Sequence, residues 1–274
     1  MKEKIKIILI VLSVLLSYVG LIVLNYYILP NRPSQFEYTI TEEQTVTITG
    51  YKRDNARRVV VPAEIEGCPV TEIGRGVFSD KIEIREIVLP DTVTEIKSRA
   101  FHGCIRLKRI NIPDGVAKID YDTFTFCASL THIELPNKLQ EIRPNAFYAS
   151  GLKEIRIPDN ISVIDLKTFA VCIDLENVLL PHKLQVIDKF AFSNCRALKE
   201  IVIPEGTKSI KDCAFQDCSS LEKIWIPSSV EEIVVDEATW EEEIPMFSNA
   251  TLIVEPGSDA EEFAKDWGYQ YSYK

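Results

Sequence analysis

The stretch Leu107–Ser129 reads LKRINIPDGVAKIDYDTFTFCAS, and its pattern returns directly afterwards, over Leu130–Ser150, as LTHIELPNKLQEIRPNAFYAS. A proline that follows an aliphatic residue recurs along the chain at positions 62, 90, 113, 136, 158, 181, 204 and 227. A phenylalanine recurs beside it at positions 78, 101, 124, 147, 169, 192 and 215. Most of these spacings are 23 residues, and one in each series is 22. A fixed period of this length is typical of a solenoid built from stacked coils.

Each repeat contains the apolar spacing of a short strand. Ile110 and Ile112 are separated by one residue, so both side chains point to the same side of an extended chain. Pro113 ends that strand because it cannot donate a ladder hydrogen bond. The next apolar pair, at positions 116 and 119, suits a second wall of the coil, and the recurring phenylalanine fills the turn. One coil alone has too little core, so each coil must stack on its neighbours.

The unit closely resembles the BspA-like leucine-rich repeat, whose pattern is CxxLxxIxIPxxVxxIxxxAFxx. The matching residues of one repeat are Cys104, Leu107, Ile110, Ile112, Pro113, Val116, Ile119, Thr123 and Phe124, with Thr123 in place of the usual alanine. The resemblance extends from about Tyr38 to the end of the chain. It implies a β-rich solenoid, a leucine-rich repeat array of about eight coils, and roles such as adhesion to host or neighbouring cells.

The first 29 residues have the pattern of a membrane anchor. Residues 1–6 carry three lysines and one glutamate, and residues 7–29 are an uncharged run of 23 residues. As a helix this run is about 35 Å long, enough to cross a hydrocarbon core of roughly 30 Å. The lysines predict a cytoplasmic n-region at 1–6, a transmembrane signal anchor at 7–29 and an extracellular repeat domain. A cleaved signal peptide is the alternative, although no small-residue cleavage site is evident.

The rest of the chain divides into a stalk and one repeat domain. Prolines at 30 and 33 indicate a short stiff stalk over residues 30–37. The repeat domain is expected over residues 38–274, with a cap at 38–56, repeats at 57–254 and a C-terminal cap at 255–274. Two short strands in the first cap would cover the open edge of the first coil, which would otherwise invite aggregation.

The C-terminal cap has the pattern of a short helix. Ser258 stands three residues before Glu261, which is the spacing of a capping box. Apolar residues then follow at i, i+3, i+4 and i+7 from position 260 to Trp267, and Gly268 can end the helix. We expect this helix to seal the last coil.

The sequence offers no candidate for catalysis or for a cofactor. The net charge of −10 and the pI of about 5 argue against binding to nucleic acid. The three histidines lie at different phases of the repeat and cannot share one face, and no P-loop or nucleophile-elbow motif is present. An acidic segment, residues 234–247, could hold calcium, but it lacks an Asp-x-Asp spacing. We therefore expect no enzyme activity, no catalytic residue, no metal and no cofactor.

Five of the seven cysteines lie three residues after a recurring phenylalanine: Cys104, Cys127, Cys172, Cys195 and Cys218. A zinc site would need clustered thiols with C-x-x-C spacing, which the chain lacks. Their common phase predicts buried free thiols that each fill one small slot per coil. A disulfide somewhere in the chain is the alternative.

The residues between the two strand aliphatics form an outward column: Val60, Val88, Asn111, Glu134, Arg156, Leu179, Val202 and Trp225. The last three members are apolar, and charged residues flank them at Lys199, Glu200, Glu222 and Lys223. An exposed apolar patch with a charged border is typical of a protein contact. We expect these seven residues to bind a protein or a surface glycan. Alternatively, the acidic segment with Trp240 folds back over the patch.

The sequence thus predicts a single-pass protein of the cell membrane whose extracellular repeats bind a protein or glycan partner, with adhesion as the role that the resemblance implies. A structural spacer or cell-envelope scaffold without a specific ligand is the alternative function.

Overall fold

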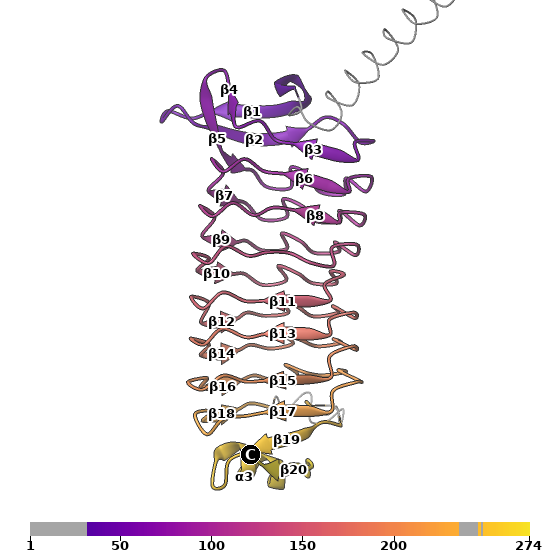
Figure 1. Ribbon diagram of the computed structural model, residues 1–274, viewed down its shortest axis with the longest axis vertical. Helices are drawn as coiled ribbons and strands as arrows, with labels where there is room; N and C mark the ends of the chain where they lie inside the picture. The colour runs from indigo at the N-terminus through magenta and orange to yellow at the C-terminus, as the bar shows by residue number, and fades with distance from the viewer. Residues whose placement is uncertain (1–31, 236–245, 248) are drawn as a thin grey trace, which may run out of the picture.

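Each repeat forms one coil with two walls and a turn, and the coils stack into a column (Figure 1). The structure is a computed structural model that describes residues 32–235, 246–247 and 249–274 of the chain. Over these residues the chain is a β-solenoid of about nine turns with a short helix near its C-terminal end. The predicted solenoid is therefore confirmed. It has about one turn more than the repeating prolines indicate, because Pro256 of the last turn follows a glutamate.

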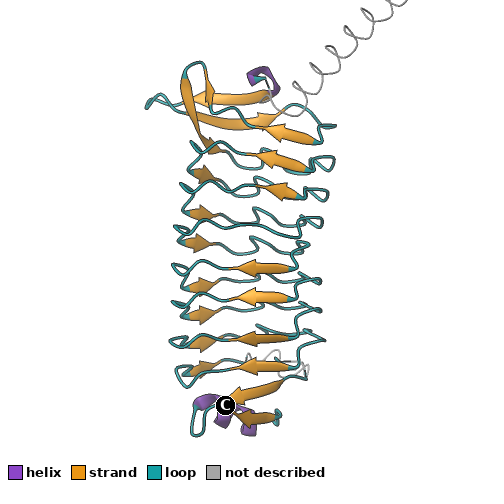
Figure 2. Cartoon of the chain, viewed as in Figure 1, coloured by secondary structure: helices purple, strands orange, loops and turns teal. Residues whose placement is uncertain are grey.

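The first wall, which we call the strand face, consists of short parallel strands (Figure 2). Its members are β3 (Arg58–Val60), β6 (Glu86–Val88), β8 (Arg109–Ile110), β11 (Glu154–Arg156), β13 (Asn177–Leu179), β15 (Glu200–Val202), β17 (Lys223–Trp225), β19 (Thr251–Val254) and β20 (Tyr271–Tyr273). Hydrogen bonds join them into three separate sheets, β3-β6-β8, β11-β13 and β15-β17-β19-β20. The coil between β8 and β11 has no strand over residues 131–135.

The second wall is also built from parallel strands. They are β5 (Cys68–Ile73), β7 (Glu95–Ile96), β9 (Lys118–Ile119), β10 (Glu141–Ile142), β12 (Val163–Ile164), β14 (Val186–Ile187), β16 (Ser209–Ile210) and β18 (Glu232–Ile233). In each of these strands the recurring aliphatic residue points inward, and Ile119 and Ile164 are fully buried. Ladders of like side chains therefore fill the core, as the period predicts.

The turn around each phenylalanine closes the coil. The rings from Phe78 to Phe215 are stacked with neighbouring centroids 5.2–5.6 Å apart, and all of them are fully buried. In each turn the residues two before and two after the phenylalanine have a left-handed backbone, as at Asp122 (φ 56) and Phe126 (φ 61). The backbone N–H groups of these two residues and of Phe124 all donate to carbonyls of the next coil.

One coil is a residue shorter than the others, and Gly151 accommodates the deletion. Its N–H donates to Cys127 O (3.1 Å), and a Cβ added at this position would lie 2.1 Å from Ala128 O. Since such a contact is impossible, only glycine lets the two backbones approach this closely.

The N-terminal end is covered by a two-stranded cap. β1 (Phe36–Ile40) is antiparallel to β2 (Val46–Tyr51), which pairs in parallel with β5, and β4 (Glu64–Ile65) forms a hairpin with β5. Phe36 is only 1% exposed and its ring lies 5.2 Å from that of Tyr51. β1 thus begins at Phe36, inside the stretch that the sequence assigns to the stalk. A 3-10 turn, η2 (Pro33–Gln35), precedes it.

The C-terminal end is covered by helix α3 (Asp259–Asp266) and strand β20. The N–H of Glu261 donates to Ser258 Oγ, as the capping-box spacing predicts. The carboxylate of Glu261, however, accepts from Gly257 N–H (2.6 Å) instead of Ser258 N–H, and from the hydroxyl of Tyr273 (2.8 Å). Gly268 follows the helix with φ +71°. Glu261 therefore ties the helix to the last strand.

The predicted membrane segment lies outside the described residues, as do the n-region and residues 236–245 of the acidic segment with Trp240. Within the residues that the structure describes, no helix is long and apolar enough to cross a membrane.

The C-terminal cap should lose stability in acid. Lys265, at 2.6 Å, together with the Gly257 N–H and the Tyr273 hydroxyl, lowers the pKa of Glu261 from 4.5 to about 2. Because the folded-state pKa is depressed, the stabilisation is fully present above about pH 4.5 and is lost as the pH falls towards about 2. We expect Glu261→Gln to lower the Tm at pH 7, and the difference from the wild type to shrink over this pH range. Thermal unfolding followed by circular dichroism measures both.

Glu262→Gln is the matched control, because the Glu262 side chain is exposed in the same helical turn and makes no hydrogen bond or ion pair with any described residue. Its Tm should stay close to the wild-type value. A Tm difference for Glu261→Gln that does not change with pH would contradict this role of the carboxylate.

Candidate functional site

The three predicted apolar residues lie in one column on the strand face. Val202 on β15 is directly opposite Trp225 on β17, and Leu179 ends the neighbouring strand β13. Leu179 is 53% exposed and Val202 is 61% exposed, whereas Trp225 is half-buried. The structure thus brings the three side chains to one surface, with Trp225 set deeper than the other two.

The column continues beyond the residues that the sequence indicates. Ile253 on β19 lies opposite Trp225 and is half-buried. Ile253 could not be assigned to the column from the sequence. The interval between Pro227 and Phe247 breaks the period, so the period does not predict the register of β19. We call Leu179, Val202, Trp225 and Ile253 the apolar strip.

The charged residues beside the apolar strip are left without partners. Lys199, Glu200, Glu222 and Lys223 are all exposed, and within the described part of the chain none of these side chains makes an ion pair or a hydrogen bond. Charges on the second wall are instead paired across coils, as in Lys208–Glu231 (2.5 Å) and Lys211–Glu232 (2.6 Å). The charges that border the strip thus differ from those of the second wall, which pair across coils.

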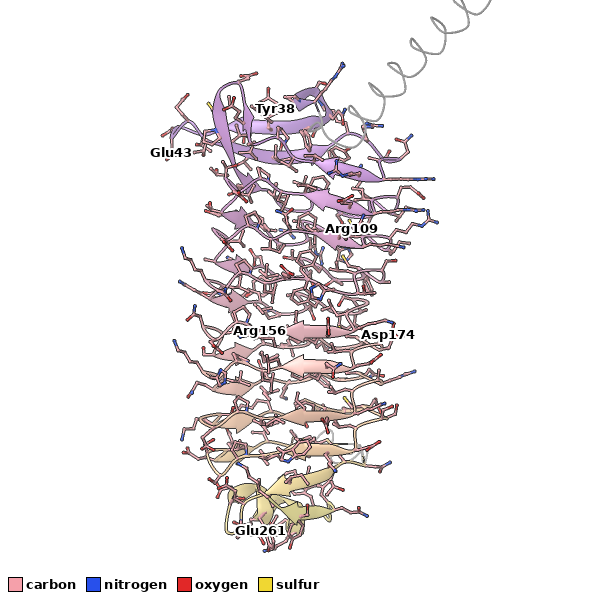
Figure 3. The ribbon with its side chains drawn as sticks, viewed as in Figure 1. Tyr38, Glu43, Arg109, Arg156, Asp174 and Glu261 are labelled. Carbon is pink, nitrogen blue, oxygen red and sulfur yellow. The ribbon has the colours of Figure 1, made fainter. Side chains whose placement is uncertain are left out.

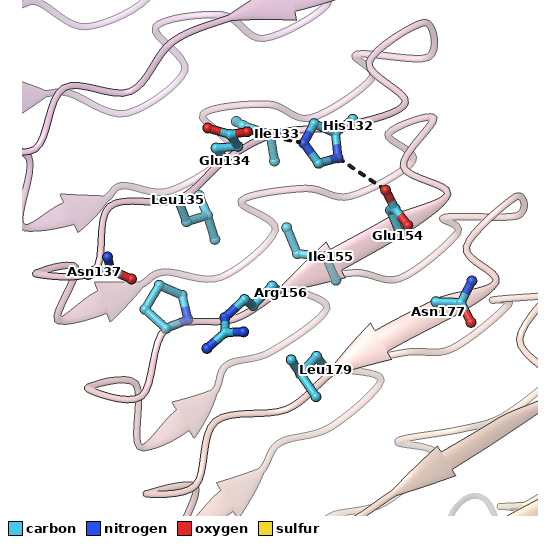
Figure 4. Close-up of a pocket in the computed structure, with 11 residues that line it drawn as sticks. His132, Ile133, Glu134, Leu135, Asn137, Glu154, Ile155, Arg156, Asn177 and Leu179 are labelled. Atoms are coloured by element: carbon cyan, nitrogen blue, oxygen red, sulfur yellow. Dashed lines mark ion pairs between the residues drawn. The ribbon is translucent and has the colours of Figure 1, made fainter.

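A hollow adjoins the N-terminal end of the strip. In the coil between β8 and β11, the backbone N–H groups of residues 131–135 have no hydrogen-bond partner among the described residues, and Thr131 O accepts only from Lys153 N–H. Because the ladder is open here, the surface contains a hollow of about 440 Å³. Leu135, Ile155, Pro158 and Leu179 line it (Figure 4). Leu179 belongs to both the hollow and the strip, so the two are continuous.

The charged groups lie at different parts of this hollow. His132 is between two glutamates, with Nδ1 3.4 Å from Glu154 Oε1 and Nε2 3.9 Å from Glu134 Oε1. Arg156 lies beside Leu179, away from Glu134 (Figure 4), and makes no ion pair with any described residue. Figure 3 shows Arg156 and Arg109 on the same wall. Glu134 and Arg156 stand in the outward column of the sequence, but nothing in the sequence indicates the open ladder that makes the hollow.

On the N-terminal side of this coil, the side chain of Asn111 bonds to the backbone of the preceding coil. Leu89 N–H donates to Asn111 Oδ1 (2.8 Å), and Asn111 Nδ2 donates to Leu89 O (2.8 Å). The side chain thus occupies backbone groups that would otherwise continue the ladder. A second hollow of about 410 Å³ lies here, lined by Val88, Asn111 and His132 among others.

Each of the three histidines faces its own carboxylate. His102 lies 3.8 Å from Asp80, His132 lies 3.4 Å from Glu154, and His182 lies 2.9 Å from Asp159. Hydrogen bonds from the backbone and ring of His182 lower the pKa of Asp159. Over the described residues, no group of three or more histidine, cysteine or acidic side chains could hold a metal ion.

The prediction of buried free thiols is confirmed for the five cysteines of the common phase, and Cys68 and Cys213 are also buried and free. Each of the five in the common phase donates its S–H to the carbonyl of the phenylalanine one coil earlier: Cys104 to Phe78, Cys127 to Phe101, Cys172 to Phe147, Cys195 to Phe169 and Cys218 to Phe192, at 3.0–3.2 Å. Burial raises the pKa of Cys104 to about 12 and that of Cys172 to about 11.

Comparison with known proteins agrees with this architecture. The chain matches the model of the BspA type leucine rich repeat region in six copies, over residues 64–176 and 140–237. Because this match covers more than half of the chain, the chain belongs to the BspA-type leucine-rich repeat family. No curated protein matches its sequence.

Several solved structures are similar to the chain. A leucine-rich repeat protein of T. pallidum is 30% identical over 70% of this chain and 91% of its own length, with a TM-score of 0.66. A leucine-rich repeat protein of Bacteroides ovatus is 24% identical, with coverage of 84% and 79% and a TM-score of 0.49. A leucine rich cell surface protein of Faecalibacterium prausnitzii is 21% identical, with coverage of 86% and 97% and a TM-score of 0.34.

The five thiols in the common phase should be unreactive in the folded protein. Thiolate is the reactive form, so a raised pKa and burial should slow alkylation by N-ethylmaleimide. We expect mass spectrometry without reductant to show seven modified cysteines after denaturation and at most one before it. Cys68, which is 8% exposed, is the expected exception, and Cys68→Ser should remove any fast labelling. Thiols that stay blocked after denaturation would show a disulfide.

Proposed function

We propose that the chain is a membrane-anchored, extracellular binding protein whose apolar strip contacts a partner protein. The observation that carries this proposal is an exposed apolar column bordered by charges that pair with no residue that the structure describes. Leu179 and Val202 expose more than half of their side chains, so they contribute little to the core. A solenoid does not need apolar residues at an outward phase, and an apolar patch with a polar rim is typical of a protein interface.

A protein fits this surface better than a glycan. The strip contains four aliphatic or aromatic side chains, and its border carries two lysines and two glutamates that pair with no described residue. Charges of both signs can be matched by a partner of complementary pattern, which gives specificity and register. Arg156 and the hollow extend the surface towards the middle of the array. Adhesion through this surface is the role that we propose.

A structural spacer is the competing function. A spacer would be expected to pair its exposed charges across coils, as the second wall does at Lys208–Glu231 and Lys211–Glu232. The difference between the two walls favours a binding function for the strand face.

The proposed location rests on the sequence of residues 1–29. We expect residues 7–29 to remain in the mature protein, because the uncharged run is long enough to span a bilayer and has no evident cleavage site. N-terminal sequencing of the protein purified from membranes checks this. A mature chain that begins after residue 20 would show cleavage. Protease treatment of intact cells should digest the repeats and leave the N-terminal tail protected.

Val202 is a cleaner probe of the strip than Trp225, because Trp225 is half-buried and its truncation would also affect packing. A photo-cross-linking amino acid placed at Val202 in the full chain should capture one partner in the producing cells, which mass spectrometry then identifies. Val202→Asp should weaken binding of that partner at least tenfold, or about 1.4 kcal/mol, because a carboxylate would be buried in an apolar contact. The Tm should not change.

Val163 provides the matched control. It is 38% exposed on β12 of the second wall. Neither the cross-linker at Val163 nor Val163→Asp should affect the interaction. Equal cross-linking from both positions, or unchanged affinity for Val202→Asp, would contradict the proposal. Capture of a glycan-bearing species through its sugar would make the strip a glycan site.

A further inference from the structure

A row of three aromatic rings runs along the turns of three neighbouring coils. The ring of Phe126 lies 5.6 Å from that of His102 and 5.7 Å from that of Tyr148, with interplanar angles of 84° and 85°. Phe126 is 46% exposed, and the other two are half-buried. These residues lie outside the core stack, which contains Phe101, Phe124 and Phe147. We call His102, Phe126 and Tyr148 the aromatic row.

Phe126 occupies a backbone position that disfavours it. Its φ is +61°, in the left-handed region where a bulky side chain is an outlier. The equivalent position in other coils holds Asp80, Gly103, Ala149, Val171, Asn194 and Asp217, none of which is aromatic. The fold therefore does not require a ring here. A residue held in an unfavourable conformation at an exposed position points to a function.

We propose that the aromatic row binds a saccharide chain by stacking. Exposed rings bind the apolar C–H faces of pyranose units, and Phe126 is the most exposed ring of the row. Polar groups lie at both ends of the row. His102 Nδ1 is 3.8 Å from Asp80 Oδ1, and the Tyr148 hydroxyl has no hydrogen-bond partner among the described residues. These groups can bond sugar hydroxyls.

The size of the row and its charges argue against a protein at this site. A stable protein interface buries roughly 800 Å² on each partner. An aromatic side chain offers about 150–250 Å² in full, and none of these three is more than 46% exposed. Arg99 and Asp122, which belong to the same turns as His102 and Phe126, pair with each other at 3.2 Å, unlike the charges that border the apolar strip. The aromatic row is separate from the strand face. Saccharide binding by the row therefore does not depend on the proposed contact of the apolar strip with a protein.

The test uses the full chain in lipid nanodiscs on an array of defined oligosaccharides that includes cell-surface and cell-wall glycans. We expect the wild type to bind at least one glycan class, and Phe126→Gly to bind it at least tenfold more weakly. Glycine adopts a positive φ without strain, so Phe126→Gly should keep the Tm or raise it slightly. A gain or no change in stability together with lost binding is the signature of a functional ring.

Phe190→Gly is the matched control. Phe190 is also left-handed, with φ 57, but its ring lies near Lys167 and outside the aromatic row. It should leave glycan binding unchanged. The proposal is overturned if no glycan binds, or if Phe126→Gly binds like the wild type. It is also overturned if that variant lowers the Tm by more than about 4 °C, because the ring would then be structural. If Phe126→Gly instead loses the binding of a protein, the aromatic row is a protein-binding site.

Discussion

The turn that encloses each phenylalanine holds the coils of this solenoid together. From Gly76 to Asn194, every turn donates three backbone hydrogen bonds to the next coil, from the residues two before, at and two after the phenylalanine. This ladder is uninterrupted, whereas the strand face is divided into three sheets and has no strand at residues 131–135. Because the turns fix the stacking, the strand face can open into a hollow at one coil without disturbing its neighbours.

The left-handed backbone of two residues in each turn costs conformational free energy. A non-glycine residue in this conformation costs roughly 1–2 kcal/mol, and most turns lower that cost with aspartate, asparagine or glycine. Burial of one phenylalanine contributes about 1.5–3 kcal/mol, and each hydrogen bond to the next coil adds about 0.5–1.5 kcal/mol. These contributions offset the cost of the left-handed backbone, even where Val171 or Phe126 takes that position.

The sequence predicts those features that repeat. The period identifies the solenoid, and the common phase of Cys104 and Cys172 correctly predicts buried free thiols, since a position that recurs in every coil must have the same surroundings. Features that occur once and depend on contacts between coils could not be predicted. Asn111 turns its side chain onto the backbone of Leu89, and the open ladder beside it depends on contacts that no spacing reports. The left-handed backbone of Phe126 is likewise visible only in three dimensions.

Inward and outward positions of this fold therefore carry different information. The inward residues are fixed by stacking, because a change in one coil alters the packing of both neighbours. They match the family model and are the reason why the chain belongs to the BspA-type family. Outward residues face no such constraint, so an outward residue that is costly or unpaired needs a cause other than the fold. Lys199 and Glu222 without an ion pair to any described residue, Val202 in solvent and Phe126 in a strained turn all meet this condition. The charges of the second wall that pair across coils, as at Lys208–Glu231 and Lys211–Glu232, do not meet it, because stacking explains them.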